Sequence, residues 1–299
     1  MATKLNKLGV WAFIDEMSAK EAADFASQLE AWGYSALWIP EAVGRDPFSI
    51  ISYMASATEK LVFATGIANI YARDPMSMNA LRRTVGEIAP GRFIMGLGVS
   101  HAPLVKDIRG HDYRKPVTTM RKYIEGMDSA LYMAEEAPEP PPILLGALRQ
   151  NMLKLSAEKG SGAHPYFVPP QHTAWARGIL GADALLCPEQ MLLMEPDPDK
   201  ARQIARAHMG TYTTLDNYRN NLKQFGFEDE DFENGGSDKL VDAIVAWGEK
   251  PALVDRIQAH WSAGADHVCI QALQDESQRG PDIAALEALA PVHNPDLAG

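Results

Sequence analysis

Short apolar runs alternate with longer amphipathic segments along the chain. The runs are rich in β-branched and aromatic residues, as buried strands are, and several segments between them have a helical period. Eight such runs occur, at residues 7–13, 35–40, 61–70, 92–100, 142–148, 163–168, 184–194 and 266–273. Because they are continuously apolar rather than alternating, they are typical of parallel strands that are covered on both faces.

Two of the segments between these runs predict helices clearly. Residues 19–32 carry an apolar stripe, with Ser18 as N-cap, Glu21 in position for a capping box and Gly33 as the stop. Residues 118–134 repeat the apolar spacing of a helix that is half buried.

Eight strand–helix units in one chain predict a single α/β domain over residues 1–299, a (β/α)8 TIM barrel. A doubly wound open sheet is the alternative, but no GxGxxG follows the first strand. The interval 198–247 is too long for one unit. We expect a helical insertion over the barrel mouth at about 198–236, followed by a helix at 238–247.

Composition and charge limit the classes of partner. The formal net charge is −11, which argues against nucleic acid or an anionic membrane as the main partner. Cys187 and Cys269 lie in apolar runs without partners at metal-ligand spacing, as buried thiols in a reducing compartment do. The chain begins without a signal-peptide pattern and contains no run of about 18 apolar residues. We therefore expect a cytoplasmic protein that acts on a small molecule.

Polar and small residues collect where the predicted strands end. In a barrel these carboxyl ends form the active face, where a ligand replaces solvent. The candidates there are Glu41, Thr65, Gly66, Ile67, Ala68, Asn69, Ser100, His101, Gly146, Ala147, Leu148, His172 and Thr173.

Each candidate also has a structural interpretation. Glu41 could cap a helix, His101 could be a turn residue, and residues 146–149 could form a plain turn. Read functionally, the helix starts near Gln150 and at 169–173 present N–H groups that favour a phosphate. No HxH or HExxH motif, GxSxG motif or strand-end lysine occurs, which argues against a metal site, a serine nucleophile and Schiff-base chemistry.

Five stretches together resemble a known superfamily. They are GYSALWIPE at 33–41, LVFATGIANIYARDP at 61–75, GRFIMGLGVSH at 91–101, the loop RGHDYRKP at 109–116 and the late segment 218–271. This ensemble resembles the bacterial luciferase-like flavin and deazaflavin oxidoreductases, and within them the branch of coenzyme F420-dependent oxidoreductases. The resemblance covers nearly the whole chain.

The resemblance implies hydride transfer between F420 and a small organic substrate. It places a non-prolyl cis peptide at Gly66–Ile67 as a shelf under the cofactor ring. It places the cofactor phosphate against residues 146–148 and against the turn from Val168 to Thr173. Glu41 stands where relatives have an acid after strand 2.

The chain departs from the family pattern at two positions. Deazaflavin-dependent sugar-phosphate dehydrogenases of the superfamily have a catalytic histidine where this chain has Ala42, and a glutamate where it has His101. Sugar-phosphate oxidation therefore does not follow from the resemblance. An imidazole titrates near neutral pH, so we expect His101 to transfer the proton and Glu41 to orient the cofactor or the histidine.

Several alternatives stay open at this point. An FMN-dependent luciferase-like monooxygenase is the first, and a non-catalytic flavin- or deazaflavin-binding barrel is the second. Relatives are often dimers, so a homodimer is possible. Tyr212 and Tyr218 could line a pocket for an apolar or aromatic molecule, or belong to the core. The sequence does not indicate the substrate.

Overall fold

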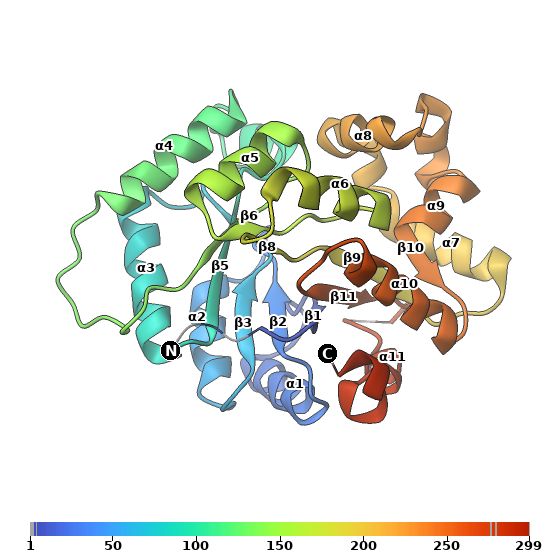
Figure 1. Cartoon of the computed structure of the whole chain (residues 1–299), viewed down its shortest axis with the longest axis horizontal. Helices are drawn as coiled ribbons and strands as arrows, with labels where there is room; N and C mark the ends of the chain where they lie inside the picture. Colours follow the sequence, from blue (N-terminus) through green and yellow to red (C-terminus); the bar gives the residue numbers. More distant parts are fainter. Residues whose placement is uncertain (1–2, 4, 276, 279, 299) are drawn as a thin grey trace.

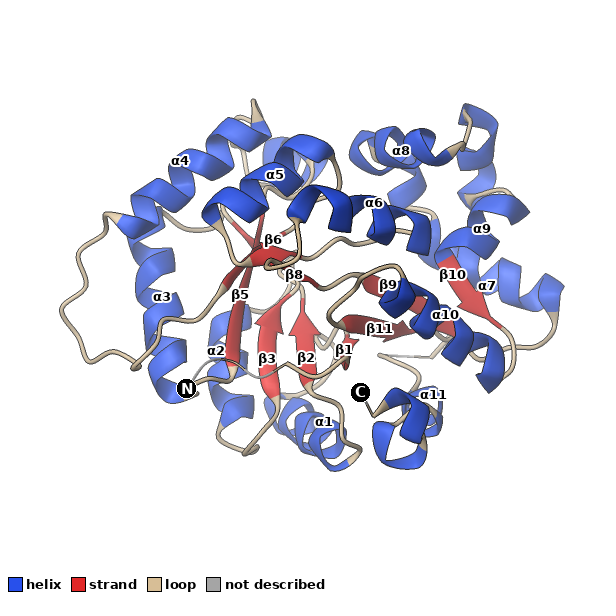
Figure 2. Cartoon of the chain, viewed as in Figure 1, coloured by secondary structure: helices blue, strands red, loops and turns tan. Residues whose placement is uncertain are grey.

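A curled, parallel β-sheet forms the centre of the protein. The computed structural model describes residues 3, 5–275, 277–278 and 280–298. Neighbouring strands follow the order β10-β9-β11-β1-β2-β3-β5-β6-β7-β8, with β4 paired to β5, and every pairing is parallel (Figure 2). The strands are β1 (Leu8–Trp11), β2 (Ala36–Ile39), β3 (Val62–Thr65), β4 (Ala68–Asn69), β5 (Phe93–Gly98), β6 (Ile143–Leu145), β7 (Gly162–Ala163), β8 (Leu185–Leu186), β9 (Glu189–Leu193), β10 (Val245–Trp247) and β11 (Val268–Ala272). Each predicted apolar run overlaps at least one of them.

The run from Leu185 to Leu193 connects β8, at one end of this strand order, to β9, which is next to the other end. Its first part, β8, pairs with β7, and its second part, β9, pairs with β11. Only Cys187 and Pro188 separate the two parts. The architecture is therefore an α/β fold with a curled parallel sheet, consistent with a TIM-barrel-like arrangement.

Helices cover the outside of the sheet (Figure 1). Those of the first two thirds of the chain are α1 (Ala19–Ala31), α2 (Pro47–Ala55), α3 (Pro75–Ile88), α4 (Pro116–Asp128), α5 (Gln150–Lys159) and α6 (Pro170–Leu180). The later ones are α7 (Pro198–Met209), α8 (Asp216–Leu222), α9 (Asp238–Ile244), α10 (Lys250–Ser262) and α11 (Ile283–Ala288). Short π- or 3₁₀-helical turns are η1 (Leu104–Ile108), η2 (Tyr212–Thr214), η3 (Lys223–Phe225), η4 (Asp229–Gly235), η5 (Pro291–His293) and η6 (Pro295–Leu297).

Local sequence signals explain where the helices begin better than where they end. The capping box of α1 is confirmed, because the Ser18 hydroxyl accepts from Glu21 N–H and the Glu21 carboxylate accepts from Ser18 N–H. The extension of α4 to residue 134 is wrong. The helix ends at Asp128, and Leu131 is exposed to solvent. The apolar spacing continued past the helix without a core to pack against.

The predicted helix at 238–247 is also too long. It stops at Ile244, and Val245–Trp247 form β10 instead. Val245 and Ala246 are buried where β10 pairs with β9. A β-branched residue next to an available strand edge favours pairing over another helical turn.

Large aromatic side chains lie within the sheet's inner cluster. Trp38 stacks on His164, with ring centroids 4.5 Å apart, and its indole N–H donates to His267 Nε2. Cys187 and Cys269 belong to the same cluster and are free and buried, as predicted. Within the described ranges, no helix combines the length and the apolar character needed to cross a bilayer.

Candidate active site

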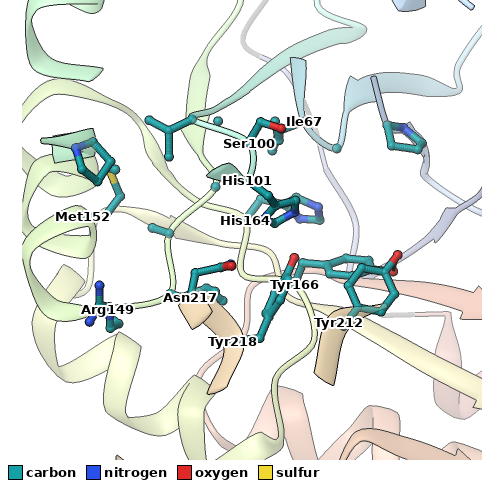
Figure 3. Close-up of a pocket in the computed structure, with 18 of the residues that line it drawn as sticks. Ile67, Ser100, His101, Arg149, Met152, His164, Tyr166, Tyr212, Asn217 and Tyr218 are labelled. Atoms are coloured by element: carbon teal, nitrogen blue, oxygen red, sulfur yellow. Dashed lines mark hydrogen bonds between the residues drawn. The ribbon is translucent and has the colours of Figure 1, made fainter. Parts of the chain in front are cut away.

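A cavity of about 730 Å³ opens where the strands end (Figure 3). Its walls come from the ends of the early strands, the start of α5, and the segment from η2 to η3. Eight predicted site residues line it: Glu41, Gly66, Ile67, Ser100, His101, Gly146, Ala147 and Leu148.

Ile67 forms a raised shelf on one wall of the cavity. The Gly66–Ile67 peptide bond is cis, as the resemblance implied. Trp11 fixes this segment from below, because its indole N–H donates to the Gly66 carbonyl at 3.0 Å. A Cβ atom at Gly98 would lie 2.4 Å from the Ile67 side chain, and one at Gly146 would lie 3.2 Å from it. A larger residue at either position would therefore crowd the Ile67 side chain, which packs against both glycines.

Glu41 holds the shelf from the side. One carboxylate oxygen accepts from Arg73 at 2.6 Å, and the other accepts from Asn69 N–H at 2.8 Å. Glu41 N–H in turn donates to the Ile67 carbonyl at 3.1 Å. Both oxygens are thus committed to neighbouring chain segments, so the geometry favours a positioning role for Glu41 over proton transfer.

The remaining residues of the strand 3 candidate segment serve the fold. Thr65 donates its hydroxyl proton to the Gly96 carbonyl at 2.7 Å, and Asn69 Oδ1 accepts from Tyr71 N–H at 3.0 Å. Ala68 and Asn69 form β4, which pairs with β5. Thr65, Ala68 and Asn69 are fully buried outside the described lining of the cavity. Their expected direct contact with a cofactor is therefore replaced by support of the shelf.

His101 reaches the cavity from the end of β5. The preceding residue, Ser100, has a φ of 55°, a left-handed turn that redirects the chain after the strand. Burial lowers the pKa of His101 below its usual value, and contact with Asn217 partly opposes this. Among the described atoms, His101 Nδ1 has no hydrogen-bond partner. His101 therefore lines the cavity as a neutral imidazole, and its unpartnered Nδ1 is buried behind the cavity surface.

His164 is a site residue that the sequence reasoning missed. It follows β7 and lines the cavity next to Gly66. Its Nδ1 lies 2.7 Å from the Cys187 carbonyl, an acceptor, so Nδ1 carries the proton and Nε2 is an acceptor. Nε2 is buried without a partner in the described structure, and burial lowers the pKa of His164 to about 4. The only signal in the sequence was a histidine near the start of the apolar run at 163–168.

One of the two expected phosphate-binding helix starts faces the cavity. Arg149, Gln150 and Asn151, at the start of α5, line it. The start of α6 does not fit the expectation. Pro169 and Pro170 have no N–H to offer an anion.

Val168, His172 and Thr173, next to those prolines, are buried outside the described lining. His172 bonds to the Leu148 carbonyl at 2.7 Å, and Thr173 bonds to His260 at 2.8 Å. Through these hydrogen bonds the two side chains connect α6 to the segment at Leu148 and to α10. Of the two helix starts expected near a cofactor phosphate, that of α5 therefore lines the cavity and that of α6 is outside the described lining.

Three tyrosines face the shelf from the other side of the cavity. Tyr166 follows β7, whereas Tyr212 and Tyr218 belong to η2 and α8. Tyr166 Oη lies 2.9 Å from Tyr212 Oη and 3.0 Å from Gln271 Oε1. Both interpretations left open for Tyr212 and Tyr218 apply, because the two side chains line the cavity and also pack in an apolar cluster.

A buried carboxyl group lies behind the tyrosines. Glu189, the first residue of β9, accepts a hydrogen bond from Phe167 N–H at 3.1 Å through Oε2. Phe167 has a φ of 61°, in the left-handed region. Burial raises the pKa of Glu189 to about 8, so this carboxyl is mostly protonated at neutral pH. The hydrogen bond from Phe167 to Glu189 thus stabilises the turn that follows His164 and Tyr166.

The chemistry of the cavity does not suggest a metal site. In the part of the chain that the structure describes, no cluster of histidine, cysteine and acidic residues has the geometry to hold an ion. The site instead offers an apolar shelf, a helix start, neutral imidazoles and aromatic walls.

Comparisons with known proteins agree on one family. A model described as luciferase-like monooxygenase matches residues 5–267. 5,10-Methylenetetrahydromethanopterin reductase from Archaeoglobus fulgidus is 26% identical over 227 residues, 67% of this chain and 68% of that protein. A putative coenzyme F420-dependent oxidoreductase from Mycobacterium tuberculosis is 27% identical over 119 residues, 40% of this chain and 33% of that protein. This chain thus matches about a third of the second relative's length.

Solved structures show the same fold at low identity. The coenzyme F420-dependent tetrahydromethanopterin reductase from Methanopyrus kandleri superposes with a TM-score of 0.73 at 18% identity, covering 98% of this chain and 100% of that one. A type II Baeyer–Villiger monooxygenase from Pseudomonas putida, in complex with FMN, superposes with a TM-score of 0.71 at 14% identity. The superposition covers 98% of each chain. These two likenesses establish the fold and leave the cofactor open.

Proposed function

The chain belongs to the luciferase-like monooxygenase family, as its motifs indicated, and from this premise we propose an oxidoreductase that transfers hydride between coenzyme F420 and a small organic substrate. The observation that carries the proposal is the Ile67 shelf, which lies between Gly98 and Gly146 in a cavity large enough for a tricyclic ring. The name of the Mycobacterium tuberculosis relative supports F420 over FMN. We also propose that residues 198–236 are an insertion over the mouth of a (β/α)8 barrel.

The residues present fit a flat cofactor with an anionic tail. Ile67 offers an apolar face for a ring, and the glycines beside it allow close approach. The start of α5 offers oriented N–H groups and the cationic side chain of Arg149 for a phosphate. When bound, a deazaflavin supplies a ring carbon that accepts or gives a hydride.

The protein's own residues then have distinct tasks. Glu41 and Trp11 fix the shelf on which the ring would lie. His101, a neutral imidazole with a free nitrogen, accepts the proton that an alcohol must lose when its carbon gives up a hydride. Tyr218 covers His101 at a ring-centroid distance of 5.4 Å and keeps water away from it.

A second candidate is an FMN-dependent monooxygenase. It is favoured by the likeness to a monooxygenase structure that contains FMN. The choice matters, because a deazaflavin does not activate dioxygen as a reduced flavin does. A barrel that binds its cofactor without catalysis is a third candidate.

Titration of the purified protein with each cofactor tests the proposal. We expect F420 to bind at least about 10-fold more tightly than FMN, measured by fluorescence and by calorimetry at equal ionic strength. Tight binding of FMN without binding of F420 would replace the proposal by the monooxygenase. Binding of F420 without oxidation of reduced F420 by any compound in a broad panel would favour the non-catalytic barrel.

Arg149→Glu should weaken F420 binding by about 10-fold or more, because it places a negative charge where we propose the cofactor phosphate. The matched control is Lys154→Glu, which makes the same charge change at an exposed position one turn further along α5, outside the cavity lining. Affinity is measured by the same titration. Equal losses in both variants would show only a long-range effect of charge, and an unchanged affinity in Arg149→Glu would place the phosphate elsewhere.

A further inference from the structure

The two sides of the cavity differ in chemistry. Figure 3 shows Arg149 and Met152 on one side, and Tyr166, Tyr212 and Tyr218 together on the other. Among the described lining residues, the acidic and basic side chains are Glu41 and Arg149. Glu41 is already paired with Arg73, so Arg149 is the one charged group of the lining that a ligand could pair with.

The side with the tyrosines is aromatic and uncharged. Its rings are in contact one after another. The distance between ring centroids is 5.1 Å for Trp11 and Tyr166, 5.2 Å for Tyr166 and Tyr212, and 5.5 Å for Tyr212 and Tyr218. His101 extends the series at 5.4 Å from Tyr218. Burial raises the pKa of each of the three tyrosines, so all three hydroxyls are neutral at physiological pH.

Hydrogen-bonding groups on this side are neutral as well. Asn217, Asn220 and Gln224 line the cavity next to Tyr218, from α8 and η3. They can donate to a carbonyl or accept from a hydroxyl. An anionic group would lose its hydration here without gaining a cationic partner, which is costly in a largely buried site.

We propose that the tyrosine side of the cavity binds a neutral, planar, cyclic substrate that carries a hydroxyl or carbonyl group. The rings provide stacking or edge contacts for a flat molecule, and His101 with the amides provides partners for its single polar group. This inference rests on the proposed function only in naming the ligand a substrate. Binding itself is a property of this chain's own residues.

Two probes of the same ring size but different charge test this inference. We expect 2-naphthol to bind the full chain at pH 7.5, without any cofactor, at least about 10-fold more tightly than 2-naphthoate, by titration calorimetry. Since no cofactor is present, failure of F420 to bind would not affect this result. Naphthoate binding as tightly as naphthol, or no binding of naphthol, would overturn the inference.

Two variants locate the binding. Tyr218→Leu should weaken naphthol binding by about 10-fold or more, whereas Tyr53→Leu, which removes an exposed tyrosine from α2, should leave it unchanged. Asn217→Lys should raise the affinity for naphthoate by about 10-fold, because it supplies the missing cation at a half-buried position. The second variant keeps the test decisive even if Tyr218→Leu does not fold. Unchanged naphthol affinity in Tyr218→Leu, or unchanged naphthoate affinity in Asn217→Lys, would place the ligand elsewhere and overturn the inference.

Discussion

His101→Ala should lower turnover by at least about 100-fold while changing F420 affinity by less than about threefold. His101 lines the cavity, its buried Nδ1 has no hydrogen-bond partner within the described structure, and we propose its imidazole as the acceptor of the substrate proton. Without a positioned base, the proton must leave to water, from which the aromatic side of the cavity is shielded. The readout is the rate of F420 reduction with an alcohol substrate.

The pH dependence of this rate provides a second test. Burial lowers the pKa of His101, so the neutral form needed to accept a proton persists below pH 6.5, and the rate should fall only at more acidic pH. The residual rate of His101→Ala should not show this fall at acidic pH. His111→Ala, at an exposed histidine outside the described lining, is the matched control. It should keep both the normal rate and the fall of the rate at acidic pH. Near-normal turnover in His101→Ala would return His101 to the role of a turn residue.

Glu189→Gln should stabilise the protein increasingly as pH rises. The pKa of Glu189 is raised to about 8 by burial, whereas a glutamate in an unfolded chain titrates near 4.3. Between these values the native state keeps a proton that the unfolded state has released, so the free energy of unfolding falls with rising pH. Each pH unit inside this window corresponds to at most about 1.4 kcal/mol. Glutamine keeps an oxygen for Phe167 N–H and removes this dependence.

The measurement is urea unfolding of both proteins at pH 5, 6, 7 and 8. We expect the difference in unfolding free energy between variant and wild type to grow by about 2–4 kcal/mol across this range, in favour of the variant. The buried histidines His164, His172, His260 and His267 also have lowered pKa values, but they occur in both proteins and cancel in the difference. Glu87→Gln, at an exposed position on α3, should give a difference that stays flat. A flat difference for Glu189→Gln would contradict a neutral carboxyl.

Much of the fold could be predicted from local apolar patterns. Continuous apolar runs mark the strands because parallel strands bury both faces, and Ser18 with Glu21 marks the start of α1 through its own backbone bonds. The end of α4 and the strand β10 could not be predicted in this way. Both depend on which neighbouring surface is available, and this is a property of the assembled sheet.

The candidate site shows the same limit. Residues at strand ends could be predicted to lie near the cavity, and Ile67, His101 and Ala147 do. The direction in which each side chain points could not be predicted. Thr65 and Thr173 turn to partners inside the protein, and His164 turns to the cavity. The pairing of Glu41 with Arg73 across 32 residues was equally invisible in the sequence.

The place of β11 in the sheet has a consequence for how the chain is made. β11 fits between β9 and β1, so a strand near residue 270 pairs with one near residue 9. During synthesis β1 and β9 therefore keep open, hydrogen-bonding edges until almost the whole chain has left the ribosome. Such edges can pair with other nascent chains, so we expect the growing polypeptide to be most prone to aggregation before β11 is made.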